Sequence, residues 1–133
     1  MLVSRPLAAL LGIALWAAAA DAAAAKDPEV RVRATCGGAA EAKLKLESRD
    51  QTLEVEFELE HSRTAEGLWR VVVVHEGRVE WRGSARAHGG RFNVRRRLDD
   101  LPAADRVTVR ASGPGGLNCT AAATLRELPS SGH

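Results

Sequence analysis

The stretch Leu53-Glu-Val-Glu-Phe-Glu-Leu-Glu60 decides the fold of this chain. Apolar residues occupy every second position, and glutamates occupy all the positions between them. Because side chains of a β-strand alternate between two faces, a strand here would have one apolar face and one fully charged face. We therefore expect residues 53–59 to form a strand that packs on a core with one face only.

The same alternation recurs before and after this stretch, interrupted by clusters of turn residues. Alternating segments cover 30–36, 42–46, 69–74, 79–85, 92–94, 107–111 and 117–125. Seven or eight short strands in about 100 residues predict an all-β, antiparallel immunoglobulin-like sandwich. A small closed barrel is the alternative architecture. A helix is the alternative for residues 39–47, where Ala, Glu, Lys and Leu all favour helix.

The length of one turn can be chosen by side-chain parity. A two-residue turn, Glu76-Gly77, would place Trp81 on the face opposite Trp69. A three-residue turn, His75–Gly77, would place both Val79 and Trp81 on the face of Trp69, with its glycine at the left-handed position. Because the second register gathers the apolar side chains on one face, we expect the three-residue turn.

The first 25 residues have the three parts of a secretory signal peptide. Arg5 gives a positive start, residues 7–16 form an uncharged and mostly apolar run, and small residues follow up to Ala25. This run is shorter than the roughly 20 residues of a membrane span, although an uncleaved N-terminal anchor is an alternative. Cleavage after Ala20 or after Ala25 would each follow an Ala-x-Ala triplet, and we expect it after Ala25.

The chain therefore divides into three expected parts: a signal peptide at 1–25, a β-sandwich domain at 26–127 and a flexible C-terminal tail at 128–133. No second long apolar stretch follows the leader. We expect a secreted or cell-envelope protein without a transmembrane segment after cleavage. Arg and Ala are frequent and Tyr is absent, a composition that favours a GC-rich bacterial source.

Cys36 and Cys119 are the two cysteines of the chain. In an exported protein an isolated pair is most simply a disulfide. The bridge would close almost the whole sandwich domain into one loop. The pair lacks Cys-x-x-Cys spacing, so we expect neither a redox-active nor a metal-binding role for it.

Several segments together resemble known protein types. Val107-Thr-Val-Arg-Ala111, preceded by Leu101-Pro102, resembles the late strands of immunoglobulin-like and fibronectin-III-like domains. The order of leader, Arg33-Ala-Thr-Cys-Gly-Gly38, the 53–59 stretch and a late cysteine resembles small exported proteins of actinobacterial type whose function is unassigned. The resemblance covers nearly all of the chain after the leader. It implies export and a sandwich fold, and it transfers no catalytic residue.

The sequence contains no recognisable catalytic or metal-binding motif. The histidines, His61, His75, His88 and His133, are scattered over turns, strand ends and the terminus, where we expect them to be exposed, and no two have metal-ligand spacing. The chain has no Gly-x-Ser-x-Gly elbow and no phosphate-binding glycine loop. Asp99-Asp100 more simply ends a strand than forms an acid–base pair. We expect no enzyme, no cofactor and no metal.

The four glutamates of the 53–60 stretch would repel each other unless cations flank them. Opposite charges across adjacent strands stabilise a sheet by roughly 0.2–1 kcal/mol per pair. In an immunoglobulin-like order, the two neighbouring strands would present Lys43 and Lys45 on one side and Arg91, Arg95 and Arg97 on the other. We expect a Lys–Glu–Arg ladder, which would pair most of the basic 95–97 run internally, and we expect no nucleic-acid partner.

The other sheet would then keep unmatched positive charge. Its outward candidate binding face should include Arg70, Val72, Val74, Arg78, Arg82, Arg106 and Arg110, with Glu80 as the main acidic member. An exposed apolar spot rimmed by arginines can bind a partner. An ordinary solvated sheet face is the alternative.

These observations favour a non-catalytic exported binding or adhesion-type module of unknown ligand. The partner would be an anionic cell-envelope polymer or another exported protein. The alternative is a secreted enzyme inhibitor, directed at a protease, that presents the loops Ser62–Gly67 and Ser112–Gly116. We expect a monomer or a weak dimer through Val72 and Val74, and the formal net charge of +2 implies no particular partner.

Overall fold

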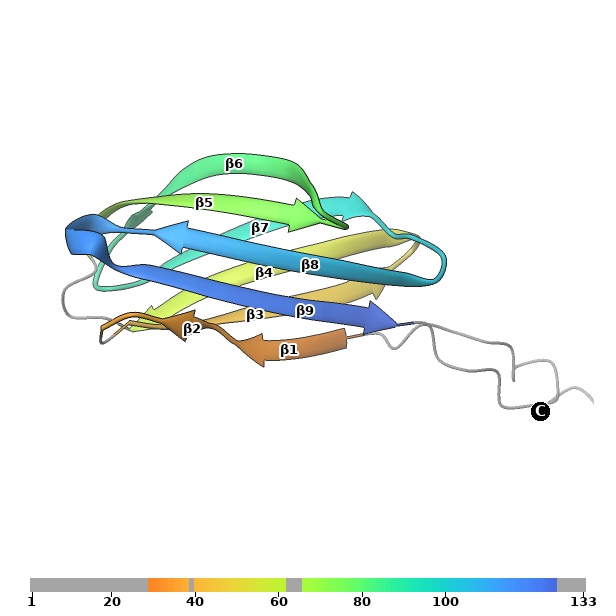
Figure 1. The fold of residues 1–133 in the computed structure, drawn as a ribbon, viewed down its shortest axis with the longest axis horizontal. Coiled ribbons are helices and arrows are strands. Elements are labelled where there is room, and N and C mark those ends of the chain that lie inside the picture. The colour runs from red at the N-terminus through yellow and green to blue at the C-terminus, as the bar shows by residue number, and fades with distance from the viewer. Residues whose placement is uncertain (1–28, 39, 62–65, 127–133) are drawn as a thin grey trace, which may run out of the picture. The chain divides into compact units, whose positions relative to one another are not determined.

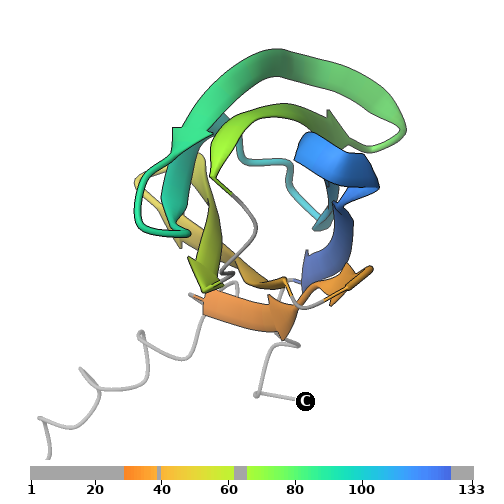
Figure 2. The ribbon, with the colours of Figure 1, turned by 90° about the vertical axis from the view of Figure 1, so that its left-hand side faces the viewer.

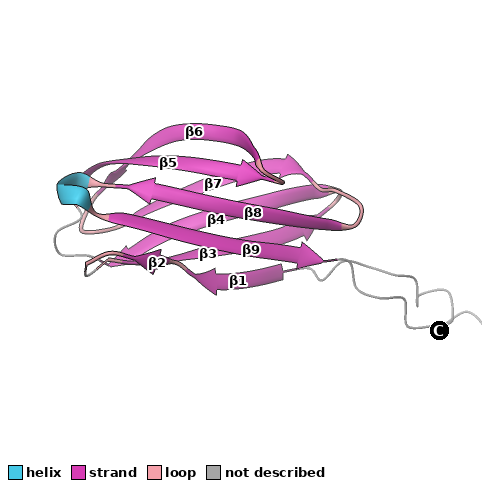
Figure 3. Ribbon diagram, in the orientation of Figure 1, coloured by secondary structure: helices cyan, strands magenta, loops and turns pink. Residues whose placement is uncertain are grey.

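The computed structural model describes residues 29–38, 40–61 and 66–126, which form strands joined by short turns (Figures 1 and 3). The strands are β1 (Glu29–Arg33), β2 (Thr35–Cys36), β3 (Glu41–Arg49), β4 (Thr52–His61), β5 (Gly67–His75), β6 (Arg78–Ala87), β7 (Phe92–Asp99), β8 (Ala104–Ser112) and β9 (Asn118–Arg126), with one turn of 3-10 helix, η2 (Pro114–Gly116). No helix within these ranges is long and apolar enough to cross a membrane. The expected signal peptide and C-terminal tail lie outside the described residues.

The strands form two antiparallel sheets. One has the order β1-β3-β4-β7 and the other β2-β9-β8-β5-β6. The neighbours β4 and β7 of the first sheet continue into β5 and β8, which are neighbours in the second sheet. This is the connectivity of an immunoglobulin-like sandwich. The expected all-β fold is confirmed, and residues 41–49 form strand β3, not the alternative helix.

The first alternating segment, expected over 30–36, is divided between the two sheets. Val32 pairs with Leu44 of β3, whereas Thr35 pairs with Thr120 of β9. Between them the Ala34 N–H donates to the carbonyl of Ala42 at 2.9 Å. The chain thus crosses from the edge of one sheet to the edge of the other, and β1 and β2 close that side of the sandwich (Figure 2, orange).

Cys36 and Cys119 form the expected disulfide. The two residues are direct partners in the β2–β9 pairing, so the bridge lies within one sheet. It joins the neighbouring strands β2 and β9, which are the first and last strands of that sheet in chain order. The bridged residues are separated by 83 positions in the chain. The crosslink therefore encloses nearly every strand of the domain.

The core is built from the inward rows of both sheets. Leu53, Val55, Phe57 and Leu59 of β4 are 0–2% exposed. They face a second buried row in β5 that begins with Trp69. Aromatic contacts join the layers, since the Phe92 ring centroid of β7 lies 6.1 Å from Phe57 and 5.5 Å from Trp69.

The turn between β5 and β6 differs from the expected three-residue turn. His75 pairs with Arg78, so the turn has two residues, Glu76 and Gly77, both with positive φ. Val79 then faces outward, 47% exposed, opposite Val74. A bulge at Glu80 shifts the register, and Trp81 pairs with Val73 on the core side after all. Without the bulge, the two-residue turn would have placed Trp81 on the outer face, so the side-chain parity alone predicted the wrong turn length.

His75 is buried, although we expected exposed histidines in turns and at strand ends. Its side chain is 4% exposed, and Nε2 lies 2.7 Å from Oδ1 of the fully buried Asp105. The same carboxylate oxygen accepts the Leu101 N–H at 3.0 Å. The pair therefore joins β5 to the start of β8 and holds the loop that enters β8.

Removal of the disulfide should destabilise the domain strongly. A closed loop of this size is worth about 4.5 kcal/mol in the chain-entropy model, a large share of the roughly 5–15 kcal/mol stability of a typical domain. We expect the double variant Cys36→Ala, Cys119→Ala to unfold at a much lower urea concentration. Reductant should lower the midpoint of the wild type and leave that of the variant unchanged. Equal midpoints for oxidised wild type and variant would contradict the assignment.

Loss of the Asp105 carboxylate should also lower stability. Asp105→Ala removes the acceptor of a buried histidine nitrogen and of the Leu101 N–H, which should cost about 3 kcal/mol. Urea unfolding monitored by circular dichroism measures this loss. Asp99→Ala, at an exposed position nearby in the chain, is the control and should change the midpoint little. Equal effects of the two substitutions would disprove a structural role for the buried pair.

Candidate binding surfaces

The outward face of the β1-β3-β4-β7 sheet carries the expected Lys–Glu–Arg ladder. Lys45 pairs with Glu56 and Lys43 with Glu58 across β3 and β4, while Arg95 and Arg97 pair with Glu56 and Glu54 across β4 and β7. The ion-pair distances are 3.5 Å for Lys45–Glu56, 3.9 Å for Lys43–Glu58, 2.8 Å for Lys43–Glu60, 3.1 Å for Arg95–Glu56 and 3.8 Å for Arg97–Glu54. Arg91 lies outside the ladder, in the turn before β7, where it bridges to His88.

Glu56 is the centre of this ladder. The side-chain amide of Asn93 donates to its Oε2 at 2.7 Å. This hydrogen bond, followed by the hydrogen bond and charge of Arg95 and the charge of Lys45, lowers the pKa of the Glu56 carboxyl. The hydrogen bond from Lys43 likewise lowers the pKa of Glu60 and raises that of Lys43. The charged forms on this face are thus held by their own neighbours.

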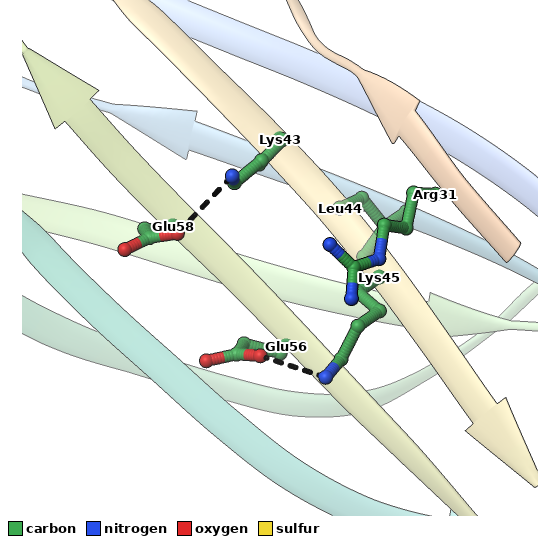
Figure 4. A pocket seen from close by; sticks show the side chains of 6 residues that line it. All are labelled: Arg31, Lys43, Leu44, Lys45, Glu56 and Glu58. Atoms are coloured by element: carbon green, nitrogen blue, oxygen red, sulfur yellow. Dashed lines mark ion pairs between the residues drawn. The ribbon is translucent and has the colours of Figure 1, made fainter. Parts of the chain in front are cut away.

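A small depression lies between the rungs of the ladder (Figure 4). Arg31, Lys43 and Lys45 line it together with Glu56 and Glu58. Figure 4 shows each lysine directed at one of the glutamates. Because anions and cations share the depression and already pair with each other, it offers no unmatched group to a ligand.

The outward face of the β2-β9-β8-β5-β6 sheet has the opposite character. Its outward positions hold exposed arginines, which are Arg70, Arg82, Arg86, Arg106, Arg110 and Arg126. None of the outward register positions of this sheet is an aspartate or glutamate. None of these arginines forms an ion pair with another residue in the described ranges. We call this surface the arginine face.

The arginines of this face surround half-buried valines. Val72 stands directly between Arg82 of β6 and Arg110 of β8 in one cross-strand row. Adjacent strands lie about 4.8 Å apart, so the two arginine backbones are separated by roughly 10 Å. A shallow groove of about 400 Å³ runs beside Val72 between Arg70 and Arg82. The face therefore combines spaced guanidinium groups with apolar surface.

Six of the seven predicted candidate residues lie on the arginine face. The exception is Arg78, which pairs with His75 at the turn and belongs to the opposite parity. Glu80, expected as the acidic member, is the bulge residue and pairs with none of the β5 residues. Sequence reasoning missed Arg86 and Arg126, although the period of two from Arg82 reaches Arg86 directly.

A second basic surface lies where the free edges of β6 and β7 face each other. An open cleft of about 480 Å³ is lined there by Trp81, Arg86, His88, Arg91 and Arg96, among others, and no acidic residue lines it. The Arg96 guanidinium carbon lies 4.7 Å from the centroid of the Trp81 ring. Such a cation–π contact at an exposed site is worth about 0.5–1 kcal/mol, so it can open readily.

Arg96 and Trp81 both come from core-facing positions. Arg96 pairs with Val55 and continues the inward row of Phe92 and Val94, whereas Trp81 pairs with Val73. The indole lies across Gly83, where an added Cβ would overlap the ring. At this edge of the sandwich, the Trp81 ring is therefore covered by the guanidinium of Arg96.

Neither metal ligands nor the two loops add a further candidate site among the described residues. In the described ranges no group of three or more His, Cys, Asp or Glu side chains could hold a metal ion. The loop Ser62–Gly67 lies largely outside the described residues. The loop Ser112–Gly116 contains η2, which closes the turn between β8 and β9.

Neutralising the central carboxylate of the ladder should reduce stability in a pH-dependent way. The lowered pKa of Glu56 means that it stabilises the fold above the ordinary glutamate pKa, and that this contribution is lost as pH falls through its folded-state pKa. We expect Glu56→Gln to lower the unfolding free energy at pH 7 by about 1 kcal/mol. The difference should shrink in urea titrations taken stepwise to pH 3. Glu80→Gln is the control, and an equal loss in both variants would contradict the ladder.

The chain has no match among protein-family models, curated proteins or solved structures. Neither a family nor a relative thus assigns a role to either basic surface.

Proposed function

We propose that this protein is an exported, non-catalytic binding module whose arginine face holds an anionic polymer of the cell envelope. One observation carries the proposal: exposed arginines cover one sheet face, and none of its outward register positions holds an aspartate or glutamate. The Cys36–Cys119 disulfide supports export, because such bridges persist in oxidising compartments. The signal-peptide pattern of residues 1–25 points the same way.

The contrast between the two sheets supports a binding role for the arginine face. On the ladder sheet every glutamate of β4 at positions 54, 56, 58 and 60 has a cation within ion-pair distance. On the arginine face the like charges repel each other with no such compensation. Repulsion of this kind is relieved when an anion binds, because guanidinium groups pair with carboxylates and phosphates in bidentate fashion.

The layout of the face favours an extended ligand over a compact one. The guanidinium groups are distributed over β5, β6, β8 and β9 and do not converge on one point. The groove beside Val72 is shallow and open. A repeating polyanion can contact several such groups at once, and the half-buried Val72 and Val74 provide apolar contact between them.

Sedimentation with isolated cell-envelope material tests the proposal. The purified, oxidised protein should pellet with the envelope at low salt and remain in solution at moderate salt, since salt screens exposed charges. Arg82→Gln with Arg110→Gln removes the two arginines that flank Val72 and should weaken binding about 30-fold, at about 1 kcal/mol for each cation near an anionic surface.

The matched control removes the same charge from the other sheet. Arg33→Gln with Arg49→Gln lies at exposed positions of β1 and β3 and should leave binding nearly unchanged. Equal weakening in both pairs would show that net charge alone drives binding. Absence of binding at low salt as well as at moderate salt would reject the polymer and direct the search to protein partners.

A further inference from the structure

We infer that the polymer is an acidic polysaccharide and that the cleft between β6 and β7 holds one of its sugar rings on Trp81. This inference rests on the proposed function, because it names the class of polymer that the arginine face would bind. It stands on three features of the cleft, which are its continuity with the arginine face, its aromatic floor and its protected strand edges.

The cleft and the arginine face share residues. Ser84 and Arg86 lie at outward positions of β6, and both also line the cleft. Ser84 lines the groove beside Val72 as well. A linear polyanion that lies along the arginine face can therefore pass over the edge of β6 and enter the cleft without leaving basic surface.

The floor of the cleft suits a ring with an acid group. Trp81 is half-buried, with its indole across Gly83 and the guanidinium of Arg96 over the ring. If Arg96 swings off the ring, its guanidinium can pair with a carboxylate or sulfate, and the apolar C–H face of a sugar can take its place on the indole. Arg91, exposed in the turn before β7, adds a second cation at the end of the cleft near His88.

A peptide strand is a poorer occupant of the same cleft. Strand addition needs a regular edge with an unbroken row of backbone groups. The edge of β6 is interrupted by the bulge at Glu80, and the edge of β7 carries the inward-pointing Arg96. Bulges and inward charges are the features by which sheet edges avoid pairing with other strands. Recognition in the cleft therefore falls to side chains, which suits a glycan.

Titrations with two polyanions distinguish binding in the cleft from binding on the arginine face. Polygalacturonate has acidic rings, whereas polyphosphate has charge without rings. Both should bind the purified protein in calorimetric titrations at low salt, as the proposed function requires. Trp81→Ala should weaken binding of polygalacturonate roughly fivefold, the scale of one aromatic contact, and leave binding of polyphosphate unchanged.

Trp81→Phe keeps an aromatic ring and should restore most of the polygalacturonate affinity. Polygalacturonate should change the tryptophan fluorescence of the wild type, and this change should vanish in Trp81→Phe. Gly83→Ala keeps Trp81 in the chain, but the added Cβ would displace its ring from its place across residue 83. This variant should therefore also weaken the binding of polygalacturonate and leave the binding of polyphosphate unchanged. If Trp81→Ala fails to fold, Gly83→Ala tests whether the Trp81 ring contributes to polygalacturonate binding.

The outcomes separate the two proposals. Equal effects of Trp81→Ala and Gly83→Ala on both polymers, or no effect on either, would overturn the cleft inference and leave the arginine face intact. Polyphosphate binding that responds to Arg82→Gln with Arg110→Gln would uphold the face in that case. Absence of binding of both polymers to the wild type would overturn both proposals.

Discussion

Burial of the inward row of β4 is the interaction on which the rest of the structure depends. Leu53, Val55, Phe57 and Leu59 are shielded almost completely from water, and the strand can bury them only by turning its four glutamates to the outer face. Four carboxylates on one strand face repel each other. The sheet is therefore stable around β4 only if both neighbouring strands bring cations to that face, and β3 and β7 each bring two.

This requirement sorts the charges of the whole domain. Lys43, Lys45, Arg95 and Arg97 pair with the glutamates of β4, and no comparable acidic row exists on the second sheet. The arginines there gain no stability from cross-strand ion pairs, since like charges placed opposite each other are unfavourable. Sequences depart from the stabilising pattern mainly at functional sites. The unpaired arginines are thus the feature on which the proposed function rests.

The alternation of side chains between the two faces of a strand explains how much of the fold and of the charged surfaces could be predicted from the sequence. It located eight alternating segments, the ladder and most of the arginine face, because each depends only on which side of a strand a residue faces. It could not place the crossing at Ala34 or the bulge at Glu80, because both depend on partners far away in the chain. The error at Arg78 and the missed burial of His75 follow from that limit. Arg96 shares the parity of Phe92 and Val94, so its inward position was readable, but its contact with Trp81 required the packing of two sheets.

The two sides of the sandwich are closed by different means, and this difference favours one of them for binding. On one side the chain crosses between the sheets at Ala34, and the Cys36–Cys119 bridge fixes the crossing covalently. On the other side the described contacts between the sheets include the turn after β6 and the contact of Arg96 with Trp81. A covalent seam cannot adapt to a ligand, whereas a weak cation–π contact can exchange its cation for a ligand at little cost. The open side also adjoins the arginine face through Arg86, so a surface closed by a weak contact lies next to the unpaired arginines.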